Sequence, residues 1–275
     1  MADDFEILNS QNSERRVSMS NSLARSAQGL SLSEKRIVAL ALSAENSKSP
    51  SKLAESTTPL GWKARIRAHD YAEAFGVDPN TAYDQLKSAS EKLFERIVTY
   101  EDKAPNGKPR LNKFRWVSLA QYTVGDGLIE LNFTPEIAPH LLGLSAKFTT
   151  YKLKHAASFE SIYAWRLFEV FSSWRSTGLY RPTIEEFWDT MEAPPSCRKD
   201  FKSLRVRVIE PSVKAIEQHG GLLVEWTPQR SGARRVTSLE FRFRPNPQGQ
   251  LDLEPVEETP PATGSDIEIS RLTSP

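Results

Sequence analysis

The sequence predicts an α+β fold in which one structural unit, helices followed by a β-hairpin, occurs twice in tandem. Residues 129–135, IELNFTP, and 239–245, LEFRFRP, share their alternation of apolar and polar side chains and their closing proline. The predicted elements that precede these two segments follow the same order, and Tyr71 and Phe187 occupy matching places in the short helix of each unit. Helices set before a hairpin, repeated once, predict two tandem winged-helix domains related by an internal pseudo-repeat.

Length and charge distribution are consistent with two domains of different character. The 275 residues suit two domains of ordinary size. Overall charge is balanced, with 36 Lys and Arg against 35 Asp and Glu, so net charge alone indicates no partner. Residues 196–244, however, hold 11 basic and 5 acidic residues, whereas residues 249–275 hold 6 acidic residues and only Arg271 as a base. The second unit is therefore the candidate for binding a polyanion.

Cysteine usage and the N-terminus bear on the compartment. The only cysteine is Cys197, which excludes an internal disulfide framework and a zinc site built from several cysteines. The N-terminus, MADDFEILNS, lacks the basic and apolar regions of a secretory signal, and no run of about 20 apolar residues is present. We therefore expect a cytoplasmic protein with no membrane partner.

The elements of the first unit are predicted from caps and periodicity. Ser31 and Glu34 form an S-x-x-E pattern that starts a helix, and the Ser-, Thr- and Pro-rich residues 46–59 form a loop. A short strand and a short helix follow, and Asp78 with Pro79 then starts a further helix. Turns at APNGKP and GDG separate three strands, expected at residues 97–102, 112–124 and 128–133.

The second unit is predicted in the same order. Residues 159–175 form an amphipathic helix, 184–191 a short helix, 194–218 a single long helix and 222–243 a hairpin. The sequence after Pro245 is rich in Pro, Glu and Thr with almost no aromatic residue, which is typical of a disordered segment. The expected organisation is a flexible N-terminal arm at 1–16, a first winged-helix domain at 17–144, a second at 145–246 and an acidic disordered tail at 247–275.

The long helix of the second unit has the pattern of a DNA-reading helix. Phe201, Leu204 and Val208 share one side, which we expect to be buried. The residues expected on the other side or its flanks, which could contact bases and phosphates in a major groove, are Arg198, Lys199, Lys202, Ser203, Arg205, Val206 and Arg207.

An ordinary solvated helix face is the alternative interpretation of this pattern. The hairpin turn QRSGARR favours DNA binding, because Arg230, Arg234 and Arg235 would lie at the tip of a wing that can grip the backbone or the minor groove.

The corresponding helix of the first unit is less basic. Asn80, Thr81 and Gln85 could read bases there, although acidic residues share the helix. Lys113, in the long wing expected for this unit, could reach phosphates. Equally, the long strands of this wing could pair with another chain, because an edge strand is a template for association.

No pattern in the sequence predicts an enzyme. The four histidines, His69, His140, His155 and His219, are scattered without metal-ligand spacing, and the phosphate-binding loop G-x-x-x-x-G-K-[ST] is absent. The acidic group on the short helix at 184–191 is interpreted as a solvated face, and Cys197 as a small residue near a helix cap rather than a redox switch. We therefore expect no catalytic residue, no metal and no cofactor.

Three segments carry a resemblance to a known family: NSLARSAQGLSLSEKRIVALALS, KFTTYKLKHAASFESIYAWRLFEVFSSW and FKSLRVRVIEPSVKAI. Over roughly residues 17–245 the chain resembles the plasmid replication initiator proteins that bind iterons, the direct repeats of a plasmid origin. This resemblance implies tandem winged helices that bind double-stranded DNA at the origin, with residues 198–207 as the main reading segment. It also implies that the first domain contributes DNA contacts and a dimer surface.

The same resemblance implies further partners. Monomers would open the origin aided by the host replication initiator and helicase loading, with chaperones as further candidate partners and plasmid copy control as an expected role. Dimers would repress the chain's own gene at an operator. A transcriptional regulator with two winged helices and no origin function remains the alternative, and a nicking enzyme would need a paired-histidine metal site that the sequence lacks.

Overall fold

A computed structural model describes residues 15–45, 57–123, 126–142, 148–231 and 235–247. Nearly all of the expected tail and of the expected N-terminal arm lies outside these residues, as does Arg234. Within the described ranges, no helix combines the length and the apolar character needed to cross a membrane.

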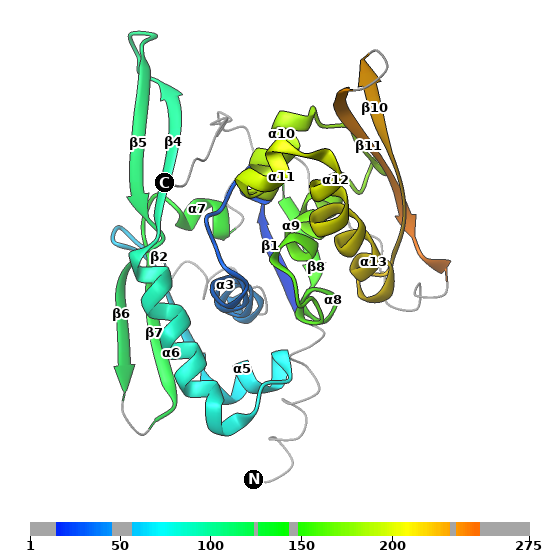
Figure 1. Cartoon of the computed structure of the whole chain (residues 1–275). Coiled ribbons are helices and arrows are strands. Elements are labelled where there is room, and N and C mark those ends of the chain that lie inside the picture. Colours follow the sequence, from blue (N-terminus) through cyan, green and yellow to red (C-terminus); the bar gives the residue numbers. More distant parts are fainter. Residues whose placement is uncertain (1–14, 46–56, 124–125, 143–147, 232–234, 248–275) are drawn as a thin grey trace.

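The first unit is a set of helices packed on a four-stranded antiparallel sheet of order β2-β3-β7-β6 (Figure 1). The predicted caps are confirmed: Ser31 N–H donates to Glu34 Oε2 at 2.6 Å, and Asp78 accepts from Asn80 N–H at 2.8 Å. The elements are β1 (Arg16–Ser20), α2 (Asn21–Arg25), α3 (Leu32–Glu45), β2 (Thr57–Thr58), β3 (Gly61–Arg67), α5 (Ala68–Phe75), α6 (Pro79–Glu95), β4 (Ile97–Lys103), β5 (Pro109–Arg115), β6 (Val117–Thr123), β7 (Leu128–Phe133) and α7 (Ala138–Leu141).

The predicted strand at 112–124 is wrong, because it is two strands in different sheets. The chain breaks at Trp116, which is buried and donates its indole N–H to the Gln28 carbonyl at 3.1 Å. Before the break, β5 pairs only with β4 and forms a two-stranded hairpin; after it, β6 pairs with β7. In Figure 1 the β4–β5 hairpin projects to the opposite end of the unit from the tip of β6–β7. Lys113 therefore lies on a projecting hairpin and not on the wing β6–β7 beside α6.

The second unit packs helices against a three-stranded sheet of order β10-β11-β9 (Figure 1). Its elements are β8 (Phe148–Lys152), α8 (Leu153–Ala157), α9 (Ile162–Ser173), β9 (Leu179–Tyr180), α10 (Ile184–Met191), α11 (Pro195–Lys199), α12 (Phe201–Leu204), the π-helical turn η1 (Arg205–Ile209), α13 (Glu210–His219), β10 (Leu222–Ser231) and β11 (Arg235–Pro245).

The internal repeat is visible in the arrangement of these elements. Tyr71 of α5 and Phe187 of α10 are both buried, and both following helices begin with a proline, Pro79 in α6 and Pro195 in α11. The alternating apolar residues of the matching segments 129–133 and 239–243 all point into the core, as their alternation predicts; these are Ile129, Leu131, Phe133, Leu239, Phe241 and Phe243. The prediction of two winged-helix domains in an α+β fold is confirmed.

The two units are joined through buried structure. The N-terminal strand β1 pairs with β8, and the helix α9 is buried on all sides over residues 164–171. The amphipathic helix expected there has no solvated face along this stretch, and two of its buried residues are charged, Arg166 and Glu169. The buried apolar side chains of both units form one continuous cluster.

Buried, oppositely charged side chains of α3 and α9 form an ion pair. Lys35 of α3 and Glu169 of α9 are 1% and 0% exposed, and Lys35 Nζ lies 2.7 Å from Glu169 Oε1. Tyr151 of β8 donates its hydroxyl to the same carboxylate oxygen at 2.6 Å, and Lys35 Nζ also donates to Gln28 Oε1 at 2.7 Å. Because each charged group has a partner, the cluster can remain inside the core.

A second ion pair, in which Arg166 is buried and Glu192 half-buried, ties α9 to the residues between α2 and α3. Arg166 pairs with Glu192 and donates to the Ser26 carbonyl at 3.2 Å. Glu192 in turn accepts from the Gly29 backbone N–H at 2.6 Å. The segment after α2 is thereby held between the two units by side chains of α9 and the end of α10.

Candidate nucleic-acid interface

The helix predicted at 194–218 is wrong as a single helix, because Asp200 ends α11 and starts α12. Asp200 has an extended backbone, with φ −136° and ψ 115°. Its carboxylate accepts from the N–H groups of Lys202 and Ser203 at 3.2 and 2.9 Å and from Ser203 Oγ at 2.8 Å. These hydrogen bonds, that from the Ser203 hydroxyl first, lower the pKa of Asp200. Asp200 therefore caps a new helix, and α12 is not a continuation of α11.

A second irregularity lies one turn further on. The Glu210 N–H donates to the Arg205 carbonyl, five residues back, which makes residues 205–209 a π-helical turn. Pro211 follows directly and has no N–H to offer the Arg207 carbonyl, so a regular α-helix cannot be maintained here. This proline is the sequence signal that could have located the irregularity.

The break at Asp200 separates Arg198 and Lys199 from the other predicted residues. Arg198 lies on α11 and is bound back to α10: Nη1 is 2.7 Å from Asp189 Oδ1, and Nε donates to the Ala193 carbonyl at 2.8 Å. The prediction that Arg198 and Lys199 share a helix with Lys202 is thus wrong. Lys199, the last residue of α11, is exposed.

From α12 onward the predicted division into two faces is correct. Leu204 and Val208 are fully buried and Phe201 is half-buried, whereas Lys202, Arg205, Val206 and Arg207 are exposed. Lys202 and Arg207 have no ion-pair partner among the residues that the structure describes. Ser203 is half-buried and bound to Asp200. The segment therefore presents three cations and one valine to solvent.

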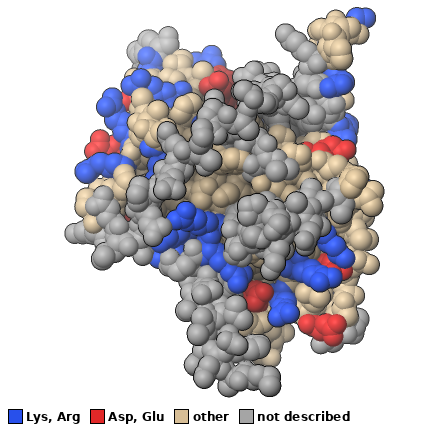
Figure 2. Space-filling view, turned by 180° about the vertical axis from the view of Figure 1, so that it is seen from behind, with Lys and Arg blue, Asp and Glu red and all other residues tan. Residues whose placement is uncertain are grey.

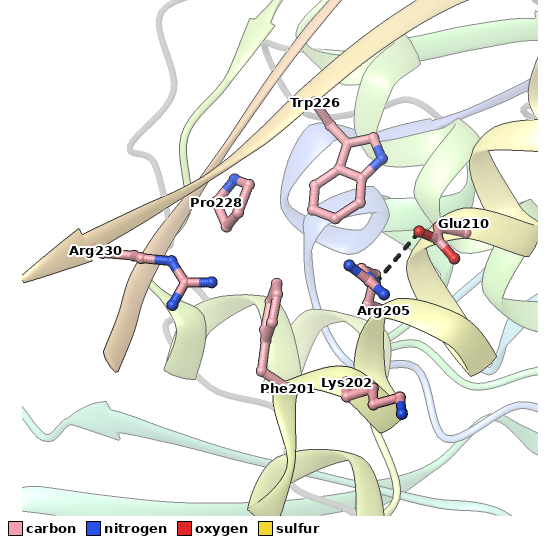
Figure 3. A pocket seen from close by; sticks show the side chains of 7 residues that line it. All are labelled: Phe201, Lys202, Arg205, Glu210, Trp226, Pro228 and Arg230. Atoms are coloured by element: carbon pink, nitrogen blue, oxygen red, sulfur yellow. Dashed lines mark ion pairs between the residues drawn. The ribbon is translucent and has the colours of Figure 1, made fainter. Parts of the chain in front are cut away.

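A hollow of about 480 Å³ separates this segment from the first strand of the wing. In Figure 3 the Phe201 side chain points away from α12 into the hollow, with the Arg230 guanidinium to one side of its ring and with Trp226 and Pro228 of β10 beyond it. The complete lining is Phe201, Lys202, Arg205, Glu210, Trp226, Pro228 and Arg230. An apolar floor rimmed by three cations suits a group that carries both a negative charge and an apolar surface.

The wing adds further basic side chains. Arg230 and Arg235 are exposed near the tip, and Arg235 Nη2 lies 3.6 Å from Glu185 Oε1 of α10. The register of the hairpin shifts between Gln229 and Arg230, a bulge of the kind that re-aims side chains next to a functional surface. Seen from behind in Figure 2, basic side chains gather over the side formed by β10 and β11, with a few acidic ones among them.

The first unit presents a polar helix instead. Asn80, Thr81 and Gln85 are exposed on the first turns of α6, as predicted. Thr81 Oγ1 donates to the Asp78 carbonyl at 3.1 Å, and Gln85 Nε2 lies 3.4 Å from Thr81 Oγ1. Their amide and hydroxyl groups are of the type that reads base edges.

The acidic residues of α10 have structural partners, and the nearby cysteine is inside the core. Glu186 completes a capping box with Thr183, while Glu185 and Asp189 pair with arginines. Cys197 is buried. Among the described residues, no three His, Cys, Asp or Glu side chains are grouped so that they could hold a metal ion.

Two winged-helix units in tandem, the second with an exposed cationic helix beside a basic wing, define the double winged-helix class of DNA-binding proteins. Comparison with known families makes the assignment particular. Residues 16–172 match the family described as Initiator Replication protein, WH1, and residues 183–243 match Initiator Rep protein, WH2. The chain belongs to this family of replication initiators, which confirms the resemblance noted in the sequence.

Individual relatives agree with this assignment. The chain is 23% identical over 264 residues to the PI protein of Escherichia coli, covering 84% of this chain and 83% of the relative. It is 26% identical over 229 residues to an uncharacterized 27.6 kDa protein of Escherichia coli, covering 80% and 92%. The crystal structure of the Pi initiator protein in complex with iteron DNA superposes with a TM-score of 0.66 at 21% identity, covering 84% of this chain and 97% of that one. The similarity to the solved structure shows that the fold is shared.

Proposed function

We propose that this protein initiates the replication of a bacterial plasmid by binding direct repeats in double-stranded DNA at the plasmid origin. The observation that carries the proposal is the exposed cationic face of Lys202, Arg205 and Arg207, which lies beside a wing that bears Arg230 and Arg235. Lys and Arg on such a helix pair with guanine edges and phosphates. Family membership supports the initiator role, and the related Pi initiator has been crystallised with iteron DNA.

The two units would share the work on each repeat. α12 and η1 would enter one major groove, and the exposed amides of α6 would read a neighbouring one. The protein itself would break no bond: binding to adjacent repeats would bend the DNA and strain a neighbouring A·T-rich duplex. Opening of the origin would then depend on the host replication initiator and helicase, in the bacterial cytoplasm.

Dimerisation is proposed to use the β4–β5 hairpin. This hairpin projects from the first unit, its two strands pair only with each other, and Ile97 and Leu111 are 41% and 57% exposed (Figure 1). Unpaired strand edges and exposed apolar side chains together favour pairing with a second copy. The dimer would repress the chain's own gene, and chaperones would shift the balance toward monomers.

Charge reversal on the recognition segment tests the proposal. In Lys202→Glu/Arg207→Glu, two favourable contacts become repulsive, so affinity for a duplex that carries the direct repeats flanking the gene should fall by at least about 100-fold. Fluorescence anisotropy measures the affinity, and circular dichroism verifies the fold. The control Lys214→Glu/Arg244→Glu makes the same charge change elsewhere in the second unit and should cost only a few-fold.

Two results would contradict the proposal. Unchanged affinity in Lys202→Glu/Arg207→Glu would show that another surface binds DNA. A wild-type chain that binds a single operator near its gene, with no direct repeats there, would be a transcriptional regulator instead.

A further inference from the structure

We infer that Glu210 competes with DNA for Arg205: its carboxylate holds the guanidinium in the free protein, and a backbone phosphate seated in the hollow between α12 and β10 displaces it. This inference rests on the proposed function and names the group that the hollow receives, one phosphate with its deoxyribose. Glu210 would thereby weaken the binding of every duplex, whatever its sequence.

The pairing of Arg205 with Glu210 depends on the π turn. In a regular α-helix, residues five apart are rotated by about 140° and cannot meet, whereas residues three or four apart can. The wider turn of η1, closed by the hydrogen bond from Glu210 N–H to the Arg205 carbonyl, brings both side chains to the same face. Arg205 Nε accordingly lies 3.4 Å from Glu210 Oε1, and Figure 3 shows the pair at one end of the hollow.

The position of Glu210 in the hollow is unusual for its charge. It is the one acid among lining residues that include Lys202, Arg205 and Arg230. A phosphate in the hollow would meet these three cations but would also meet this carboxylate. Glu210 can yield, because its side chain is 50% exposed and water can solvate the carboxylate after the pair opens.

The ion pair between Arg205 and Glu210 is weak enough for a phosphate to replace the Glu210 carboxylate. Arg205 and Glu210 side chains are 46% and 50% exposed, and half-exposed ion pairs are weak in water. A phosphate oxygen offers Arg205 an equally good acceptor and brings two more cations within reach. The phosphate therefore wins the competition, but the net affinity is lower than it would be without the carboxylate.

The apolar part of the lining identifies what accompanies the phosphate. Phe201, Trp226 and Pro228 form the floor and far wall, and all three are partly exposed to solvent. The faces of these rings suit the apolar faces of a deoxyribose. Because phosphate and sugar are common to every nucleotide, the site cannot distinguish sequences.

The test compares four proteins on two duplexes. The proteins are wild type, Glu210→Gln, Arg205→Gln and the double variant, and the duplexes are a repeat-bearing one and an unrelated one of equal length. Anisotropy titrations from about 50 to about 300 mM KCl, a range over which screening of exposed charges increases strongly, give the affinities and their salt dependence. Thermal melting verifies that each variant is folded.

Glu210→Gln should tighten binding to both duplexes by about 3- to 10-fold at the lowest salt, since the charge that competes with the phosphate for Arg205 is removed. In the Arg205→Gln background the same change should give less than about twofold, because no guanidinium remains to be released. Arg205→Gln alone should lower the slope of log affinity against log salt by about 0.9, the value for one lost phosphate contact.

Glu225→Gln is the matched control. Glu225 is exposed on β10 next to Trp226, and alternation along a strand places its side chain on the opposite face from the hollow. Removing its charge should change affinity by less than about twofold.

Three outcomes would overturn the inference while leaving the proposed function intact: no gain in Glu210→Gln, an equal gain in Glu225→Gln, or an undiminished gain in the Arg205→Gln background. A gain confined to the repeat-bearing duplex would also overturn it, because a phosphate contact ignores sequence. If the wild type binds neither duplex, the proposed function fails and the inference fails with it.

Discussion

Removing the cation from the buried cluster between α3 and α9 should be among the most damaging single changes in this chain. In Lys35→Met, a side chain of similar length replaces Lys35, and the Glu169 carboxylate, which is fully buried, loses the ammonium group 2.7 Å away. Tyr151 and Gln28 still donate hydrogen bonds to it, at 2.6 and 3.4 Å, but the contacting positive charge is gone, and Arg166 acts on it only from a greater distance while paired with Glu192. Breaking a buried pair in this way costs about 3–5 kcal/mol.

That cost is large compared with the stability of an ordinary domain, about 5–15 kcal/mol. For a chain of this size, each kcal/mol lowers the melting temperature by about 2–4 °C, so Lys35→Met should melt at least about 6 °C below the wild type. Urea unfolding at pH 7, followed by tryptophan fluorescence and by circular dichroism, measures the loss. Lys214→Met, at an exposed position of α13, is the control and should change stability by less than about 0.5 kcal/mol.

The double variant Lys35→Met/Glu169→Gln decides whether charge is the cause. The amide that replaces the Glu169 carboxylate would be neutral yet able to accept the Tyr151 hydroxyl. The double variant should therefore recover at least about 2 kcal/mol relative to the sum of the single changes. A loss below about 1 kcal/mol in Lys35→Met, or strict additivity in the double variant, would refute the reasoning.

Two further predictions concern pH and assembly. Burial raises the pKa of the Tyr180 hydroxyl to about 12, so the folded protein keeps this phenol neutral, whereas the unfolded chain ionises it near pH 10. Below pH 10 the free energy of unfolding is therefore unaffected by the titration of this group, and it falls as pH rises from 10 toward 12. Between pH 9 and 11 the wild type should therefore lose about 1 kcal/mol more stability than Tyr180→Phe in urea unfolding, and equal losses would contradict this assignment. If the chain dimerises through β4–β5 as proposed, Leu111→Glu should shift the dimer to monomer in sedimentation velocity, because a charge at that interface opposes pairing. Leu60→Glu, at an exposed apolar position outside that hairpin, should leave the dimer intact. A persistent dimer in Leu111→Glu would place the interface elsewhere.

The sequence is sufficient where a short-range signal determines the structure. The caps at Ser31 and Asp78 each depend on residues within three positions, and both helices begin as predicted. The closing strands were predictable for the same reason, since an alternation of period two requires only that one face be buried. These local signals, repeated in order, were enough to identify both winged-helix units.

The break in the first unit had a weaker signal. Apolar residues occupy even positions at Phe114 and Trp116 but an odd position at Val117, and the neighbours Trp116 and Val117 are both buried. A change of phase in such an alternation means that one continuous strand cannot keep a single buried face. The change coincides with the point where the chain passes from the β4–β5 hairpin to the main sheet.

The buried ion pairs could not be predicted from the sequence in this way. Lys35 and Glu169 lie far apart in the chain, and each taken alone has the character of a surface residue. Only the packing of α9 inside both units makes them partners. At the proposed DNA-binding surface, likewise, the exposure of Lys202 and Arg207 followed from helical periodicity, but the pairing of Arg205 with Glu210 required the π turn.

The two copies of the repeat differ most in the charge of their exposed helices, and this difference divides the proposed work between them. On α6 the acids Asp84 and Glu91 offset Lys87 and Lys92, so this helix carries no net charge over those positions. The segment from α12 to η1 carries three cations without an acid. Since salt-dependent affinity grows with the number of phosphates neutralised, we expect most of the affinity to come from the second unit. A helix without net charge adds little affinity for DNA of unrelated sequence. The amide groups of α6 can therefore contribute sequence discrimination without strengthening nonspecific binding.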